Sequence, residues 1–113
     1  MYEIRKSFEV SAAHQLPLDY ESPCGALHGH NWRITVYLRA RTLDQNGMVM
    51  DFAHIKQKIK ARLDHTVLND VLPFPPTAEN LAHFVCHELG DACYRVDILE
   101  SADSLATYTR DDL

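Results

Sequence analysis

Two stretches of the chain alternate regularly between apolar and polar residues. Within residues 2–14, an apolar face is formed by Tyr2, Ile4, Phe8, Val10 and Ala12. Residues 28–41 alternate more strongly, with an apolar face formed by Trp32, Ile34, Val36, Leu38 and Ala40. Period two with one apolar face is typical of a strand in a half-buried sheet. The pattern therefore predicts two strands, separated by a loop over residues 15–27.

The middle of the chain follows a helical period instead. Asp51 is a candidate N-cap, and one helical stripe follows it at Phe52, Ile55, Ile59 and Leu63. Thr77 can cap a second helix, whose apolar face is formed by Leu81, Phe84, Val85 and Leu89. A proline-rich break over residues 68–76 separates the two helices, and Gly90 marks the end of the second one.

Residues 94–100 and 104–110 complete the pattern as two final strands. The order strand, strand, helix, helix, strand, strand predicts an α+β fold, in which two helices cover the apolar face of a four-stranded antiparallel sheet. The length of 113 residues indicates a single domain, residues 1–113. The other sheet face is mixed in polarity, and such a face is often buried by assembly with copies of the same chain.

Composition narrows the classes of function. The net charge is -5 and no basic cluster is present, so a nucleic-acid partner is not expected. No apolar run approaches the length of a membrane span, and the charged, alternating N-terminus does not resemble a signal peptide. The three cysteines contain no CxxC pair. These features favour a cytoplasmic protein that binds neither membranes nor nucleic acids.

Three histidines are the strongest candidates for chemistry. His28 and His30 have the apolar parity of their strand, and His14 has that of the first strand. If the two strands pair antiparallel, the end of the first lies beside the start of the second. All three imidazoles then meet on one face, at one rim of the sheet. Three histidines suit zinc and leave a fourth position open for water or substrate.

Other interpretations of the histidines stay open at this point. Histidines at a rim can simply make hydrogen bonds, and His83 and His87 form a competing pair at i, i+4 spacing, which also suits a metal. That pair lies on the polar side of its predicted helix, and the sequence indicates no third ligand there. The matching parity of His14, His28 and His30 favours these three as the metal site.

Four further polar residues stand out. Cys24 lies four residues before His28, either as a fourth zinc ligand or as a base or nucleophile beside the metal. Asp64 and His65 end the first helix, where the carboxylate can orient the imidazole or the histidine can simply favour a helix C-terminus. Glu100 has apolar parity, so its carboxylate needs a partner, such as an arginine or a ligand with two N–H donors.

The motifs that contain these residues resemble the 6-pyruvoyl-tetrahydropterin synthase family. They span nearly the whole chain in the family's order: FEVSAAHQL, CGALHGHNW, MVMDFAHIK, LDHTVLND, PTAEN, and Glu100 in the third strand. The spacing of Cys24 from HGH is the sharpest point, because family members that form the pyruvoyl product usually carry two more residues there. The short spacing resembles the 6-carboxytetrahydropterin synthase branch, which serves queuosine and related deazapurine synthesis.

The resemblance implies a fold, a reaction and a metal. The fold is the tunnelling fold, whose subunits close into rings of sheets and stack as a homo-oligomer, such as a dimer of trimers. The substrate is 7,8-dihydroneopterin triphosphate, and the products are 6-carboxy-5,6,7,8-tetrahydropterin, acetaldehyde and triphosphate. The metal is Zn²⁺.

The resemblance also implies a role for each candidate residue. The zinc ligands are His14, His28 and His30. The catalytic group consists of the base Cys24, the relay pair Asp64 and His65, which reaches the site across a subunit boundary, and Glu100, which anchors the pterin. Thr77 and Glu79 help to line the pterin pocket.

Two alternatives to this activity stay open. A pyruvoyl-tetrahydropterin synthase would share the fold and the zinc site but release a different product. A zinc- or pterin-binding module would lack catalysis altogether. A triphosphate substrate also needs a basic partner, for which Arg110 is one candidate.

Overall fold

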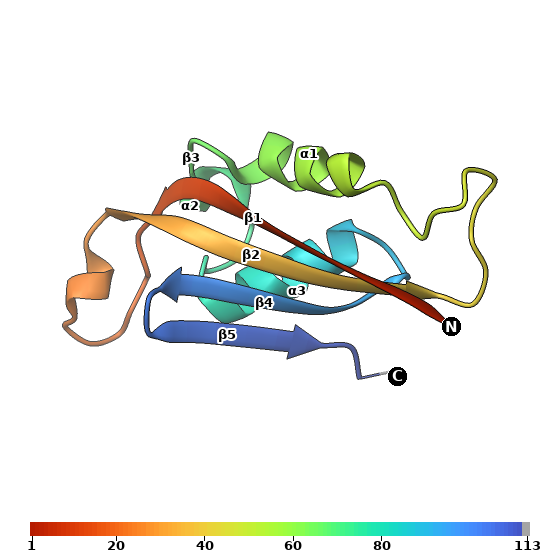
Figure 1. Ribbon diagram of the computed structural model, residues 1–113. Coiled ribbons are helices and arrows are strands. Elements are labelled where there is room, and N and C mark those ends of the chain that lie inside the picture. The colour runs from red at the N-terminus through yellow and green to blue at the C-terminus, as the bar shows by residue number, and fades with distance from the viewer. Residues whose placement is uncertain (112–113) are drawn as a thin grey trace.

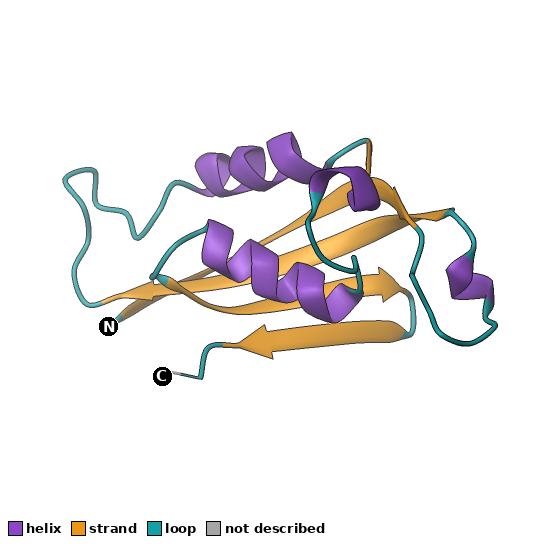
Figure 2. Ribbon diagram, turned by 180° about the vertical axis from the view of Figure 1, so that it is seen from behind, coloured by secondary structure: helices purple, strands orange, loops and turns teal. Residues whose placement is uncertain are grey.

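The computed structural model of the protein describes residues 1–111 and has two layers. One layer is a five-stranded sheet with the strand order β3-β1-β2-β4-β5. Its strands are β1 (Tyr2–His14), β2 (His28–Ala40), β3 (Thr66–Val67), β4 (Cys93–Ser101) and β5 (Ser104–Thr109). The other layer contains α1 (Phe52–Leu63), α2 (Leu68–Val71) and α3 (Ala78–Glu88), and a 3-10 turn, η1, spans Pro23–Gly25. Figure 1 views the sheet with α3 behind it, and Figure 2 shows the helices in front.

The predicted α+β class is confirmed, with one more strand and one more helix than expected. Strands β1, β2, β4 and β5 pair antiparallel, as the sequence predicts. The additional strand β3 pairs parallel to Ala12 and Ala13 of β1, and α2 follows it directly. These two elements occupy the segment before and within the predicted proline-rich break. Two strand residues and one helical turn are too short to produce a detectable hydrophobic period.

The predicted caps delimit the longer helices. The side chain of Asp51 accepts a hydrogen bond from the Ala53 amide at 2.8 Å, and that of Thr77 accepts one from the Asn80 amide at 3.1 Å. Gly90 follows the end of α3 with φ of +91°, a left-handed conformation that glycine adopts without a steric penalty. No helix in residues 1–111 is long and apolar enough to cross a membrane.

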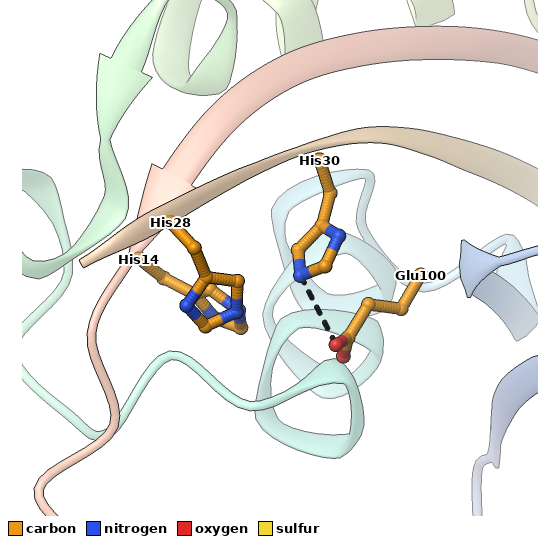
Figure 3. Close-up of side chains that lie close together, drawn as sticks. All are labelled: His14, His28, His30 and Glu100. Atoms are coloured by element: carbon orange, nitrogen blue, oxygen red, sulfur yellow. Dashed lines mark hydrogen bonds and ion pairs between the residues drawn. The ribbon is translucent and has the colours of Figure 1, made fainter. Parts of the chain in front are cut away.

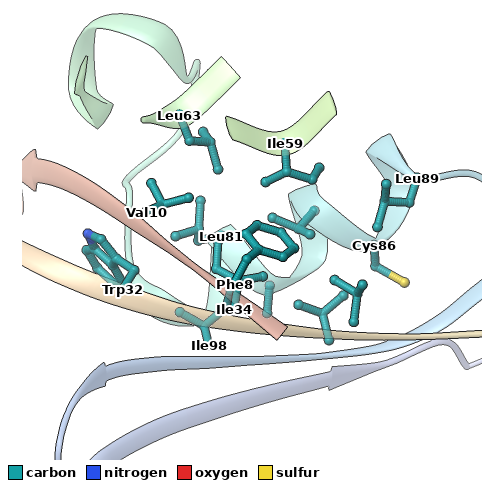
Figure 4. Packing of buried hydrophobic residues seen from close by; sticks show 14 of the residues in the cluster. Phe8, Val10, Trp32, Ile34, Ile59, Leu63, Leu81, Cys86, Leu89 and Ile98 are labelled. Atoms are coloured by element: carbon teal, nitrogen blue, oxygen red, sulfur yellow. The ribbon is translucent and has the colours of Figure 1, made fainter. Parts of the chain in front are cut away.

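The core fills the space between the sheet and helices α1 and α3 (Figure 4). The apolar parity of β1 and β2 places Phe8, Val10, Trp32 and Ile34 there, against the buried stripe of α1 that ends at Leu63. Each large apolar side chain that leaves water completely contributes about 1.5–3 kcal/mol of burial free energy. This core fixes the face of the sheet on which β1 and β2 present their even-numbered side chains.

A β-bulge changes the parity of β4 at its start. The register shifts between Tyr37 and Leu38 of β2, so that Leu38 pairs with the buried Cys93. Alternation along residues 94–100 predicts that Tyr94 shares the apolar face with Val96 and Ile98, and this prediction is wrong. Tyr94 instead faces Tyr37, at 6.3 Å between ring centroids, and contacts Glu3 on the outer face of the sheet. A bulge inserts one unpaired residue and reverses the face that the residue beyond it occupies.

Candidate metal centre

The histidines lie where β1 ends and β2 begins. The antiparallel register pairs His14 with His28 and places His30 opposite Ala12. All three side chains project from the same face of the two strands and point toward one another (Figure 3). The convergence expected from their parity is therefore present in the structure. His14 is completely buried, whereas His28 and His30 are half-buried at the rim.

Backbone carbonyls orient two of the imidazoles. Nδ1 of His14 lies 2.7 Å from the carbonyl oxygen of Pro76, and Nδ1 of His28 lies 2.7 Å from that of Ala26. A carbonyl oxygen only accepts hydrogen bonds, so both Nδ1 atoms must carry the proton. In the neutral rings, both Nε2 atoms therefore present a lone pair. Such carbonyl partners are the usual means of fixing the tautomer of a metal-binding histidine.

The two Nε2 atoms face each other at a distance of 3.0 Å. Two lone pairs at this distance repel each other unless a positive charge lies between or beside them. A proton on one ring relieves the repulsion, and a metal ion bound by both rings relieves it as well. A cation, either a proton or a metal ion, is therefore electrostatically favoured at the point where the histidines meet.

His30 completes the group, two residues after His28 and on the same face of β2. Its Nε2 atom is buried and has no hydrogen-bond partner among the described residues, although Oε1 of Glu100 lies 3.2 Å away. Burial lowers the pKa of His30, and the neighbouring His14 and His28 lower it further, against the opposing effect of Glu100. A neutral imidazole is the form that binds a metal. The side chain is therefore ready to act as a ligand.

Four side chains offer ligand atoms within 4.8 Å of one another: His14, His28, His30 and Glu100. Nitrogen and carboxylate oxygen ligands suit zinc and other divalent transition metals. This donor set fits a metal ion. The family resemblance implies that Glu100 anchors a pterin, and the structure adds that its carboxylate is also within reach of the metal position.

Cys24 does not belong to this group of ligand atoms. It lies in η1, with a half-buried side chain, and its amide donates to Oγ of Ser22 at 3.2 Å. Its backbone carbonyl accepts a hydrogen bond from the amide of Leu16, just beyond β1, at 3.1 Å. The turn that carries Cys24 is thereby attached to the end of the strand that carries His14.

Asp64 and His65 lie together at the end of α1, beside β1. His65 has φ of +57°, and this left-handed turn brings its Nε2 to 3.6 Å from Oδ2 of Asp64. The Ser11 amide donates to Oδ1 of Asp64 at 2.9 Å and is the main cause of the lowered pKa of this carboxyl, with Lys60 contributing further. The sequence left open whether Asp64 orients His65, because a left-handed histidine cannot be read from residue order.

The imidazole of His65 is 83% exposed and borders a hollow of about 380 Å³. The lining includes Ser11, Ala13 and Asn31, which have the polar parity of β1 and β2. This hollow therefore opens mainly on the polar face of β1 and β2, and His30 also borders it. His65 has no printed contact with the three histidines of its own chain, whose ligand atoms gather with that of Glu100.

Thr77 and Glu79 lie at the start of α3, close to the candidate metal centre. Thr77 serves as the N-cap, and the preceding residue, Pro76, supplies the carbonyl that orients His14. Glu79 and Glu100 line the same hollow of about 420 Å³, together with the start of β5. Glu79 therefore shares a hollow with Glu100, and Thr77 follows the residue that orients His14. Pro76 and Ala26 contribute backbone carbonyls that sequence reasoning missed. No side-chain signal could have identified them, because any residue type can offer a carbonyl.

The competing histidine pair has other partners. His83 and His87 stack at 4.3 Å between ring centroids on the exposed side of α3, and Nε2 of His87 lies 3.2 Å from the hydroxyl of Tyr108. The guanidinium of Arg110 lies 3.3 Å from Nδ1 of His87, where its charge opposes a bound cation.

Arg110 also donates to the carbonyls of Gly90 and Cys93. These bonds hold Arg110 at the opposite end of the β4–β5 hairpin from Glu100, away from the metal centre of its own chain.

The fold and this cluster define a small α+β protein with a candidate metal centre at the rim of its sheet. Comparison with known proteins gives the family. The family model described as 6-pyruvoyl tetrahydropterin synthase matches residues 3–111. The chain belongs to the 6-pyruvoyl tetrahydropterin synthase family.

Individual relatives agree with this assignment. A 6-carboxy-5,6,7,8-tetrahydropterin synthase from Synechocystis sp. is 40% identical over 121 residues, which cover 96% of this chain and 93% of that protein. A 6-pyruvoyl tetrahydrobiopterin synthase from Dictyostelium discoideum is 30% identical, covering 75% of this chain and 72% of the relative. The solved structure of Caenorhabditis elegans 6-pyruvoyl tetrahydropterin synthase superposes with a TM-score of 0.77 at 26% identity, covering 97% of this chain and 96% of that one.

Proposed function

We propose that this chain is a zinc-dependent 6-carboxy-5,6,7,8-tetrahydropterin synthase of queuosine and deazapurine synthesis, with residues 1–113 as its single domain. It converts 7,8-dihydroneopterin triphosphate to 6-carboxytetrahydropterin, acetaldehyde and triphosphate. The observation that carries the metal dependence is the pair of Nε2 lone pairs facing each other at 3.0 Å. The short spacing between Cys24 and HGH, together with the Synechocystis relative, supports the carboxypterin product.

In this proposal, His14, His28 and His30 hold the zinc ion, which supplies a Lewis acid for the hydroxyl-bearing side chain of the pterin. The Nε2 lone pairs of His14 and His28 are fixed toward each other before the metal arrives, because the carbonyls of Pro76 and Ala26 hold the Nδ1 protons. Preorganised ligands lose little freedom on binding the metal.

Cys24 serves as the base that removes a proton from the substrate carbon. A thiolate is the reactive form, and a nearby cation favours it. The exclusion of Cys24 from the group of ligand atoms supports this role over that of a fourth ligand. Asp64 and His65 form the relay and reach the site from a neighbouring copy of the chain. The 83% exposure of His65, on a hollow lined largely by the polar face of β1 and β2, supports this arrangement.

Glu100 anchors the pterin by accepting hydrogen bonds from two adjacent N–H groups of the ring, an arrangement that a carboxylate satisfies in bidentate fashion. Its hollow, shared with Glu79, lies beside the metal centre and is open to solvent. Thr77 shapes this pocket by starting α3 at its border. The charge of Glu100 selects for a cationic or N–H-rich ring edge.

The active form in this proposal is a homo-oligomer, a dimer of trimers. Two open sheet edges support assembly: β5 ends the sheet on one side, and β3 covers only Ala12 and Ala13 of β1 on the other. Unpaired strand edges pair readily with other strands. We place the protein in the cytoplasm, since its three cysteines stay reduced in the described structure, which suits a reducing compartment.

Product analysis tests the activity. The metal-replete protein is incubated with 7,8-dihydroneopterin triphosphate, and the products are identified by mass. Release of acetaldehyde with 6-carboxytetrahydropterin is the expected result. A pyruvoyl product would move the chain to the other branch of the family, and unchanged substrate with retained pterin binding would make it a binding module. Either result overturns the proposed reaction.

A further inference from the structure

The side chain of Asn69 pairs with the backbone of Gln15 through two hydrogen bonds. The amide of Gln15 donates to Oδ1 of Asn69 at 2.8 Å, and Nδ2 of Asn69 donates to the carbonyl of Gln15 at 2.7 Å. The carboxamide thus acts as one more rung of the parallel ladder between β1 and β3, which ends at Ala13 and Val67. Asn69 therefore binds both the backbone N–H and the backbone carbonyl of Gln15, the residue that follows His14.

The side chain of Gln15 continues this connection to the turn that carries Cys24. Its Nε2 donates to the carbonyl of Gly25 at 2.9 Å. The neighbouring amide of Leu16 donates to the carbonyl of Cys24 at 3.1 Å. Two successive carbonyls of η1 are therefore attached to the two residues that follow His14.

These bonds join three parts of the proposed catalytic machinery. Asn69 lies in α2, four residues after His65, so the chain that carries the relay pair is tied to Gln15. Gln15 follows the metal-site residue His14 directly and is tied to the turn of Cys24. The connection runs through side-chain carboxamides, which have both a donor and an acceptor in a fixed geometry.

We propose that Asn69 and Gln15 are positioning residues that hold the Cys24 turn at the correct distance from the metal centre. The loop over residues 15–27 contains little regular structure, only the short turn η1, and needs such attachment to keep one side chain in place. This role rests on the proposed function, in which Cys24 removes a proton from the substrate. A displacement of about 1 Å in such a group costs on the order of 100-fold in rate.

A positioning role can be separated from a purely structural one. Gln15 and Asn69 are both exposed, and water competes for exposed hydrogen bonds, so their loss affects folding little. The isosteric change Gln15→Glu removes the Nε2 donor to Gly25 and leaves the size of the side chain unchanged. Asn69→Ala removes both bonds to the Gln15 backbone. Gln57→Glu and Asp70→Ala are matched controls, because both residues are exposed on helices outside this connection.

The kinetic test compares kcat, KM and zinc content for these variants with dihydroneopterin triphosphate as substrate. We expect kcat to fall by roughly 10- to 100-fold in Gln15→Glu and Asn69→Ala, with KM and zinc content within about twofold of the parent chain. The two controls keep the parent kcat. A kcat within about twofold in the folded test variants overturns the proposal, as does a parallel loss of zinc, which would assign these residues to the metal centre instead.

Alkylation of Cys24 gives a second readout that needs no turnover. The parent chain and the variants are treated with iodoacetamide, and modification at Cys24 is followed by mass, with the buried Cys86 and Cys93 as internal references. Release of the turn should raise the rate at Cys24 by roughly threefold or more, because local opening exposes the thiol. An unchanged rate contradicts the positioning role. If the chain fails to turn over the pterin, the proposed function is wrong, and the alkylation rates still decide the role of Gln15 and Asn69.

Discussion

At the residue scale, His30 offers the most direct test of the metal centre. Its Nε2 is buried without a hydrogen-bond partner among the described residues, so its replacement removes a ligand atom and, with it, the 3.2 Å contact to Glu100. We expect His30→Ala to lose most of its bound zinc after dialysis, as measured by elemental analysis, since zinc sites with fewer than three protein ligands are rare. His83→Ala, on the exposed side of α3, should keep its zinc. Full zinc content in His30→Ala would place the metal elsewhere.

Glu100 has two possible partners, the metal and the pterin, and one substitution distinguishes them. Glu100→Gln keeps the shape of the side chain but removes the charge that accepts two N–H bonds. If Glu100 anchors the pterin, its affinity for a pterin falls by about 10- to 100-fold, the range expected for charge-assisted hydrogen bonds, and zinc content stays constant. Calorimetry with a pterin and elemental analysis measure both quantities. A loss of half the zinc would instead make Glu100 the fourth ligand.

The histidines show how far residue order predicts a site. Parity and the antiparallel pairing of two strands were enough to predict that His14, His28 and His30 converge, because side chains two apart share a face. The carbonyls of Pro76 and Ala26, which fix the tautomers, were beyond such reasoning, because backbone groups have no sequence signature. Arg110 was a reasonable basic candidate by charge, yet its place at the far end of a hairpin depends on tertiary register.

At the scale of elements, long periodic segments were predicted well and short ones were not. The boundaries of β1 and both caps follow from pattern and side-chain chemistry. Strand β3 and helix α2 together span only residues 66–71. Strand β3 forms because the edge of β1 is available for parallel pairing, which is a tertiary cause and leaves no local pattern in the sequence. The bulge that turns Tyr94 outward also has a tertiary cause. It adjusts the register between β2 and β4, and no local preference of the sequence produces it.

Asp97 connects three strands on the outer face of the sheet. Its carboxylate accepts hydrogen bonds from Tyr37 on β2, Arg95 on β4 and Thr107 on β5, at 2.7–3.2 Å. Burial alone would raise the pKa of Asp97, but the bonds from Thr107, Tyr37 and Arg95 together lower it below its usual 3.8. The charged form is therefore preferred in the folded state, and the side chain is only 14% exposed.

This lowered pKa makes the stability of the sheet depend on pH in a defined direction. Below about pH 3.8, the unfolded chain takes up a proton on Asp97 before the folded chain does, so the stabilisation is present above that pH and is lost as the pH falls through the folded value. We expect Asp97→Asn to lower the free energy of unfolding by about 1.5 kcal/mol near pH 7, with a smaller difference near pH 3. Urea denaturation at both pH values measures it. An equal difference at the two pH values would show that the charge of Asp97 is unimportant.

At the scale of the whole molecule, the proposed catalytic groups border two different hollows of the chain. The metal centre and Glu100 lie toward the core side, beside the start of α3. His65 borders the other hollow, lined in part by Ser11 and Asn31. In the proposed mechanism, a second copy brings its own His65 to the first copy's metal centre. The open edges of β1 and β5 give such copies a means of joining.

A mixture of two inactive variants tests this division. Cys24→Ala keeps a complete relay but lacks the base, and His65→Ala keeps the base but lacks the relay, so each is expected to lose at least about 100-fold in kcat while retaining zinc. When the two are unfolded, mixed and refolded together, some sites in the mixed oligomer combine an intact Cys24 with an intact His65 from another copy. Activity should therefore reappear in the mixture, at a fraction set by random assembly, and light scattering should give a mass that is a multiple of the 12.9 kDa chain. If Cys24 and His65 acted within one chain, no mixture of these variants could rebuild a complete site, and the activity would stay at the level of the separate variants.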